Sequence, residues 1–164
     1  MTSHMKFYFK PLLSVVVLAV LLGYAGCGNN KTVEPSEEEK ALTELNSQWK
    51  VGSAGNVTLD GVSKKADYAN FTLTLSGSVG STTYGYTTAN RPQLSPWPSS
   101  GTWVFVDVNN PKSGIKRDPG TAGKEVVINY TVSGDQLEIS FNYTGGGETR
   151  TNKVAGAWIF TLTK

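Results

Sequence analysis

The stretch VINYTVSGDQLEISFNYT, residues 127–144, alternates apolar and polar side chains on both sides of a Gly-Asp pair. Apolar residues recur at every second position, which is the repeat of a β-strand with one buried and one solvated face. Gly134-Asp135, between the two halves, is typical of the short turn of a β-hairpin. The stretch therefore predicts two long antiparallel strands, at 125–133 and 136–144, in a sheet that covers an apolar core.

The two-residue period continues along most of the chain from Trp49 onward. FTLTLSG (71–77) and AWIFTLTK (157–164) each place their large apolar side chains on one face. Further strands are expected at 48–53, 57–60, 70–76, 81–88, 101–108, 113–117 and 156–163. Short strands at this spacing favour a closed barrel or a sandwich. We predict an all-β fold, a small antiparallel up-and-down β-barrel of about eight strands, with a two-sheet β-sandwich as the alternative because both show this alternation.

A short helix is expected ahead of the barrel, at residues 36–47. Ser36 followed by Glu39 matches the capping box that begins many helices. The acidic run at 37–39 suits a helix N-terminus, where the helix dipole favours negative charge. Apolar side chains at 41, 42 and 45 give this helix one face to bury.

The N-terminus has the layout of a secretory signal peptide. Lys6 and Lys10 precede an apolar run, PLLSVVVLAVLL (11–22), which is too short for a comfortable membrane span. Small residues then lead to Cys27, the single cysteine. This arrangement resembles the bacterial lipobox, in which the chain is cut before a cysteine whose thiol carries a lipid. Ala25-Gly26 match that motif, whereas Tyr24 replaces its usual aliphatic residue.

We accordingly predict a lipoprotein signal peptide at 1–26 with its start at Met5, a lipidated tether at 27–35, the helix at 36–47 and a β domain at 48–164. The alternatives are a plain signal peptide with an incidental cysteine and a single-pass anchor. With Cys27 as the lipidation site, the domain is anchored to a membrane without spanning it. Gly28 resembles the outer-membrane sorting context of two-membrane bacteria, so we predict the outer membrane, with the periplasmic and surface faces both open.

Composition argues against several classes of function. Lys6 and Lys10 lie in the signal peptide, and the remaining 13 Lys and Arg balance 13 Asp and Glu. The sequence contains no stripe of basic residues, so nucleic-acid binding has little support. The single histidine is His4, and Cys27 is expected to be acylated, so the β domain lacks nucleophile–histidine pairs and the usual zinc or copper ligands. We expect no enzymatic activity, no catalytic residues, no metal and no cofactor.

Several carboxylates of the β domain are expected to stabilise turns. Asp60, Asp118 and Asp135 occupy turn positions, where the side chain bonds nearby backbone groups. Asp107 shares a strand face with Trp103 and Phe105, and a turn-capping role is favoured over a cation site.

Aromatic residues are the best candidates for binding. Trp97 lies between two prolines in SPWPSSG (95–101) and is suited either to stack on a ligand or partner or to plug one end of the barrel. The plug is the favoured interpretation. Tyr84 and Tyr86 share one strand face, where they either line a cavity or pack. Trp97, Tyr84 and Tyr86 are therefore the predicted binding residues.

Several pieces of the chain, in their order, resemble a known family. They are LNSQWKV (45–51), LDGVSKKADYANFTLTLSG (59–77), SPWPSSGTWVF (95–105), IKRDPG (115–120), LEISFNY (137–143) and AGAWIFTLTK (155–164). This order is similar to that of small lipocalin-like lipoproteins of Bacteroidetes, over about residues 45–164. The resemblance implies an antiparallel barrel on a lipid tether, with no agreed ligand and no catalytic residues to carry over. Asp118-Pro119-Gly120 and the glycine tip at 145–147 depart from that pattern.

The expected function is that of an outer-membrane-anchored lipoprotein with a non-catalytic binding barrel, acting as an accessory subunit of an envelope protein complex. The alternative is a carrier of a small apolar or sugar-like ligand in the barrel. An open apolar cavity of about 300 Å³ or more favours the carrier, whereas a filled interior favours docking. The many inward-facing aromatic residues lead us to expect a filled interior.

Overall fold

Antiparallel pairing between strands that are neighbours in the sequence organises this chain. The computed structural model describes residues 33–145 and 154–164. The predicted signal peptide, Cys27 and most of the glycine tip lie outside the described residues. Residues 35–164 form one unit, which contains the whole sheet.

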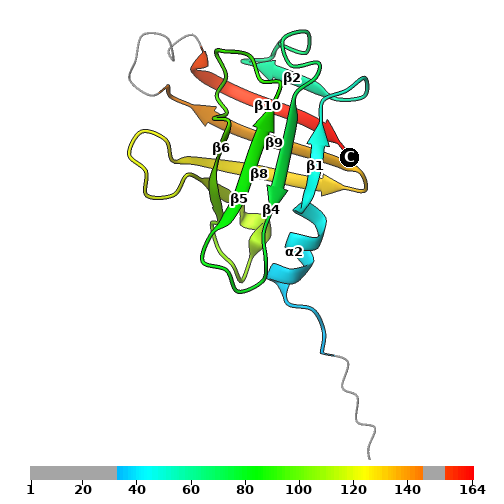
Figure 1. Ribbon diagram of the computed structural model, residues 1–164, viewed down its shortest axis with the longest axis vertical. Coiled ribbons are helices and arrows are strands. Elements are labelled where there is room, and N and C mark those ends of the chain that lie inside the picture. Colours follow the sequence, from blue (N-terminus) through cyan, green and yellow to red (C-terminus); the bar gives the residue numbers. More distant parts are fainter. Residues whose placement is uncertain (1–32, 146–153) are drawn as a thin grey trace, which may run out of the picture. The chain divides into compact units, whose positions relative to one another are not determined.

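One helix, ten strands and one 3-10 turn make up the described part of the chain (Figure 1). In chain order they are α2 (Glu37–Leu45), β1 (Ser47–Lys50), β2 (Asn56–Leu59), β3 (Val62–Ser63), β4 (Thr72–Ser76), β5 (Tyr84–Ala89), β6 (Ser100–Phe105), η1 (Pro111–Ser113), β7 (Ile115–Arg117), β8 (Val126–Ser133), β9 (Gln136–Tyr143) and β10 (Gly156–Thr163).

The sheet closes on itself as an antiparallel barrel of eight strands, which confirms the predicted fold. From β4 to β10, each strand pairs with the next one along the chain. β1 pairs with β4 over its whole length and reaches β10 through Lys50 and Thr163. β2 pairs with the middle of β10, from Trp158 to Thr161, so β1 and β2 act together as one bent strand at the seam.

The bend between β1 and β2 depends on a glycine. The Gly55 N–H donates to the Val51 carbonyl at 2.7 Å, which turns the chain between the two strands. A Cβ at this position would collide with the backbone oxygens of Val51 and Thr161, one on each side of the seam. The two halves of the seam can approach β10 only because residue 55 has no side chain.

Helix α2 begins as the sequence predicts and ends two residues earlier than expected. The Ser36 hydroxyl accepts a hydrogen bond from the Glu39 N–H at 3.1 Å, which caps the helix. Leu42 and Leu45 are buried, and the Trp49 indole donates to the Leu45 carbonyl at 2.9 Å. The helix is thereby fixed against one end of the barrel, the end at which β1 begins (Figure 1).

Some predicted strand bounds were wrong. The strand expected at 101–108 ends at Phe105, because the chain turns there toward η1. The strand expected at 81–88 begins only at Tyr84. β3 was not predicted, and it pairs with β2 through the turn at 60–61, outside the barrel's ring of eight strands.

Aromatic side chains fill the barrel interior. Trp97 packs edge-on against Phe141 at 5.8 Å between ring centroids, and Phe141 stacks on Phe160 at 6.1 Å. Phe160 in turn contacts Tyr68 at 5.3 Å. Trp97 also packs on Tyr86 of β5, with ring centroids 5.5 Å apart, so ring contacts cross the interior from β5 through Trp97 to β9. Burial of this apolar surface is the main driving force for the fold.

We predict that Gly55→Ala destabilises the barrel by about 1–3 kcal/mol, because the added methyl group forces the seam apart. Urea unfolding, followed by tryptophan fluorescence, measures the change. Gly85→Ala is the matched control, since its new Cβ would meet only the Ser76 hydroxyl at 3.2 Å. Equal stability of the two variants would contradict this account of the seam.

Candidate functional site

A charged side chain, Arg117, lies inside the barrel. β7 alternates so that Ile115 and Arg117 point inward, and Arg117 is only 1% exposed. Its guanidinium lies over the Trp97 ring, 5.1 Å from the ring centroid. One terminal nitrogen, Nη1, donates to the Pro96 carbonyl at 2.7 Å, and Nη2 donates to the Lys124 carbonyl at 3.4 Å. Arg117 therefore ties the loop before β6 to the loop between β7 and β8.

Asp118 extends this buried network. Its Oδ2 atom accepts from the Tyr86 hydroxyl at 2.8 Å and lies 3.3 Å from Arg117 Nε. Its Oδ1 atom accepts from the Thr102 N–H at 3.2 Å. A Cβ at Gly101 would collide with Asp118 Oδ1, so a glycine is required beside this carboxylate. Asp118 does occupy a turn, as predicted, but its carboxylate is buried and bonds across strands.

The electrostatics of the network suit a structural role. Burial lowers the pKa of the Arg117 guanidinium, and the neighbouring Asp118 opposes that shift. Burial also raises the pKa of Tyr86, and its hydrogen bond to Asp118 adds to the rise. An arginine remains charged in proteins, so Arg117 and Asp118 form a buried ion pair with Tyr86 as a neutral donor. We call Arg117, Asp118, Tyr86 and Trp97 the interior clamp.

The structure buries all three aromatic residues predicted to bind. Trp97 is 1% exposed and plugs the interior at the loop end of the barrel, opposite α2. Tyr86 lies beside it, with ring centroids 5.5 Å apart. Tyr84 is elsewhere, near the α2 end, where its hydroxyl donates to Glu38 at 2.6 Å and its ring packs on Trp103. A binding role for these residues stays a prediction, and Cys27 lies outside the described residues.

That Arg117 and Asp118 form part of the interior clamp was not predicted from the sequence, because charged side chains are normally expected to face solvent. The alternation of Ile115, Lys116 and Arg117 places the arginine on the same face as a core isoleucine, and this was the available signal. Asp107 behaves differently, because it is exposed and its Oδ1 accepts from the Asn109 N–H at 2.9 Å. The favoured turn-capping role of Asp107 is confirmed, whereas the strand expected around it was wrong.

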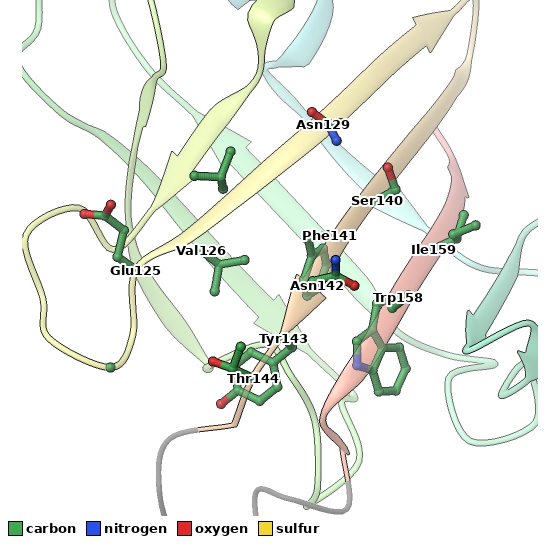
Figure 2. A pocket seen from close by; sticks show the side chains of 13 residues that line it. Glu125, Val126, Asn129, Ser140, Phe141, Asn142, Tyr143, Thr144, Trp158 and Ile159 are labelled. Atoms are coloured by element: carbon green, nitrogen blue, oxygen red, sulfur yellow. The ribbon is translucent and has the colours of Figure 1, made fainter.

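A groove of about 610 Å³ lies on the outer face of β8, β9 and β10. Exposed side chains from alternate strand positions line it (Figure 2). We call this site the outer groove, and it is defined by Glu125, Val127, Asn129, Ser140, Asn142, Ala157 and Ile159. Figure 2 shows Asn129 on β8, Ser140 and Asn142 on β9 and Ile159 on β10, side by side across the three strands.

The outer groove combines apolar surface with neutral hydrogen-bonding groups. Val127 is 52% exposed and Ile159 is 42% exposed, so both offer aliphatic surface to the groove. The side-chain amides of Asn129 and Asn142 each provide an N–H donor and a carbonyl acceptor. Glu125 is the one carboxylate among the described residues of the groove; it lies 3.8 Å from Lys116 and accepts from the Gly120 N–H. Such a surface is suited to binding an uncharged, partly apolar partner surface.

A smaller cleft of about 190 Å³ opens at the loop end of the barrel. Its walls are largely apolar and include Leu59, Tyr68, Leu94 and Trp158. No three His, Cys, Asp or Glu side chains within residues 33–145 and 154–164 come together in a way that suits a metal ion. In that same part of the chain, no helix has the length and apolar character needed to cross a bilayer.

Comparison of the chain with family models, with curated proteins and with solved structures finds no match. The resemblance to small lipocalin-like lipoproteins therefore stays a prediction that rests on the quoted motifs. The barrel itself is established by strand pairing, independently of that resemblance.

We predict that Arg117→Met lowers the free energy of unfolding by about 3–5 kcal/mol, because it leaves Asp118 buried without its cation. The neighbouring Lys116→Met is the matched control. It removes a surface contact to Glu125 and is expected to cost no more than about 1 kcal/mol. Urea unfolding of both variants gives the comparison, and similar losses would show that the clamp does not stabilise the barrel.

The buried tyrosines predict alkaline unfolding. Burial raises the pKa of Tyr68 and of Tyr130 to about 12, against about 10 in an unfolded chain. The folded state therefore holds these protons more tightly, so the stabilisation is complete below pH ~10 and is lost as pH rises to ~12. Urea unfolding at stepped pH, with tyrosinate absorbance recorded alongside, measures this. Tyrosinate forming near pH 10 with the fold intact would contradict it.

Proposed function

We propose that this chain is a lipid-anchored lipoprotein of an outer membrane whose barrel binds a partner protein, as an accessory subunit of an envelope protein complex. The observation that carries the proposal is the filled interior. Trp97, Phe141 and Phe160 occupy the centre of the barrel, and the Arg117 guanidinium fills the space beside Trp97. A barrel filled in this way favours recognition on its outer surface.

The anchor in this proposal rests on the sequence. Cys27 follows a charged and then an apolar segment, with small residues directly before it. A diacylglycerol on Cys27 would hold the barrel at a membrane through a tether, and lipid chains of this kind bind a bilayer without spanning it. No catalytic group is assigned in the proposal, because its chemistry is recognition alone.

The outer groove is the surface we assign to the partner. It is a concave site of about 610 Å³ lined by strand residues, and it offers Val127 and Ile159 for apolar contact. The amide of Asn142 lies on the intervening strand β9 and that of Asn129 lies beside Val127 on β8, and both can satisfy backbone groups of a partner. Protein interfaces commonly combine an apolar centre with hydrogen-bonding groups of this kind.

The rival function is carriage of a small ligand. The cleft at the loop end favours it, because Tyr68, Leu94 and Trp158 give that cleft apolar walls. Its volume of about 190 Å³ is smaller than the sites that usually hold such ligands, which begin at about 300 Å³, and the concavities of about 530 and 610 Å³ that exceed this volume are lined largely by exposed residues. Partner binding is therefore the proposal we favour.

We predict that Ile159→Arg removes a specific partner protein that co-purifies with the wild-type chain from its own membrane. A buried arginine without a counter-charge disfavours an apolar contact by several-fold to a hundredfold in affinity, or about 1–3 kcal/mol. Val62→Arg on β3 is the matched control, because Val62 is 62% exposed and lies outside the groove. Quantitative mass spectrometry of the purified material compares the three proteins.

Retention of the same partner by Ile159→Arg would exclude the outer groove as the docking surface. Loss of the partner in both variants would point to a general effect of added charge and would equally count against the groove. Thermal unfolding of both variants checks that the barrel is intact, and exposed positions on strand faces are expected to tolerate the change.

A further inference from the structure

The α2 end of the barrel is built from three segments that contact one another. They are helix α2, the β4–β5 connection at 77–83 and the β6–β7 connection at 106–114 (Figure 1). Glu38 joins the first two, since its carboxylate accepts from the Gly80 N–H at 2.9 Å and from the Tyr84 hydroxyl at 2.6 Å. Lys112 of η1 lies 3.8 Å from Glu44 of α2 and joins the third.

Exposed valines gather on these connections. Val79 is 54% exposed at the tip of the β4–β5 connection, and Val106 and Val108 are 42% and 46% exposed on the β6–β7 connection. Between the two connections lies a cleft of about 530 Å³, whose lining includes Val106, Val108 and the rings of Tyr84 and Phe105. Loop tips are usually polar, so exposed valines on two adjacent loops call for an apolar neighbour.

The chain that carries the predicted anchor leads into this same end. Glu37, the first residue of α2, lies ten positions after Cys27. A fully extended chain of that length spans at most about 33–36 Å. A lipid on Cys27 would therefore hold the start of α2 within about that distance of the bilayer surface. The length of the tether sets no such limit on the loop end of the barrel.

The acidic groups of this end are mostly engaged by the protein. Glu38 is bound by Gly80 and Tyr84, Glu37 pairs with Lys40 at 2.8 Å, and Asp107 bonds the backbone of its own turn. Lys40 also lowers the pKa of Glu37, so Glu37 stays ionised. Among the described residues, Lys40 and Lys112 at this end are each paired with a glutamate, and such a surface suits a zwitterionic lipid surface better than a strongly anionic one.

We propose that the α2 end of the barrel rests on the lipid surface that holds the anchor, with Val79, Val106 and Val108 in contact with the interfacial region of the bilayer. This inference rests on the proposed lipid anchor and adds the orientation of the domain. In that orientation the loop end points away from the membrane and the outer groove runs along the side of the barrel, accessible to a protein in the same membrane.

The test uses the full-length protein purified from its membrane and reconstituted into vesicles of phosphatidylethanolamine and phosphatidylcholine. Acylation blocks the Cys27 thiol, so an introduced cysteine is the single free thiol. Val79→Cys and Val108→Cys are each labelled with an environment-sensitive fluorophore. Ala122→Cys, in the exposed connection between β7 and β8 at the loop end, is the matched control.

We expect labels at 79 and 108 to shift their emission to shorter wavelength on reconstitution and to be quenched by brominated lipid, with the label at 122 unchanged. Adding phosphatidylglycerol should reduce the shift. Labels at 79 and 108 that behave like the label at 122 would overturn the membrane contact. Protection of these positions only in a native protein complex would also overturn it, in favour of a protein neighbour.

The intact mass of each labelled protein separates failure of this inference from failure of the proposed function. An unacylated mass would overturn the anchor and the inference with it. An acylated mass with water-exposed labels at 79 and 108 would overturn the orientation alone and leave the anchored binding domain standing.

Discussion

The buried charge of Arg117 is the constraint on which the loop end of the barrel depends. A guanidinium removed from water has to find hydrogen-bond acceptors and a counter-charge within the protein. Pro96 and Lys124 supply carbonyl groups, and Asp118 supplies the negative charge. Because these partners come from two separate loops, the β5–β6 connection and the β7–β8 connection, the Arg117 side chain on β7 fixes the positions of both. Trp97 is then held under the guanidinium, inside the barrel.

The two ends of the barrel are closed by different structures. Helix α2 covers one end with Leu42 and Leu45, and Trp49 bonds the last turn of that helix. The interior clamp covers the other end. Between them, the rings of Phe71, Phe141 and Phe160 contact one another or a shared neighbour. In the function that we propose, such a domain recognises its partner on its outside, where the outer groove lies.

The sequence predicted the strands well, because alternation is a local property of each segment. The Ser36 cap was predictable for the same reason, since capping involves residues three positions apart. The interior clamp was not foreseen, although the inward position of Arg117 followed from its place two residues after Ile115. A charged residue in a strand is normally expected to face solvent. The burial of Arg117 can be explained only by its contacts with Pro96 and Asp118, which are distant in the sequence or visible only in the folded structure.

The outer groove was beyond sequence reasoning for a different reason. Its lining comes from three strands, so it requires the register that places Asn129 opposite Ser140 and Asn142 opposite Ala157. Its lining also includes Gly123 and Glu125 of the β7–β8 connection, which no short motif places beside these strands. β3 escaped prediction because two residues are too few to show a period. The bend at Gly55 likewise becomes meaningful only when β10 is seen on its far side.

The central claim is that the barrel is filled and that recognition takes place on its outer surface. Native mass spectrometry of the protein, gently extracted from its own membrane, tests this most directly. We predict a mature chain that begins at an acylated Cys27 and is bound to a second protein in fixed stoichiometry. A monomer that carries one additional small molecule would contradict the claim, because it would place the recognition site in a cavity of the barrel.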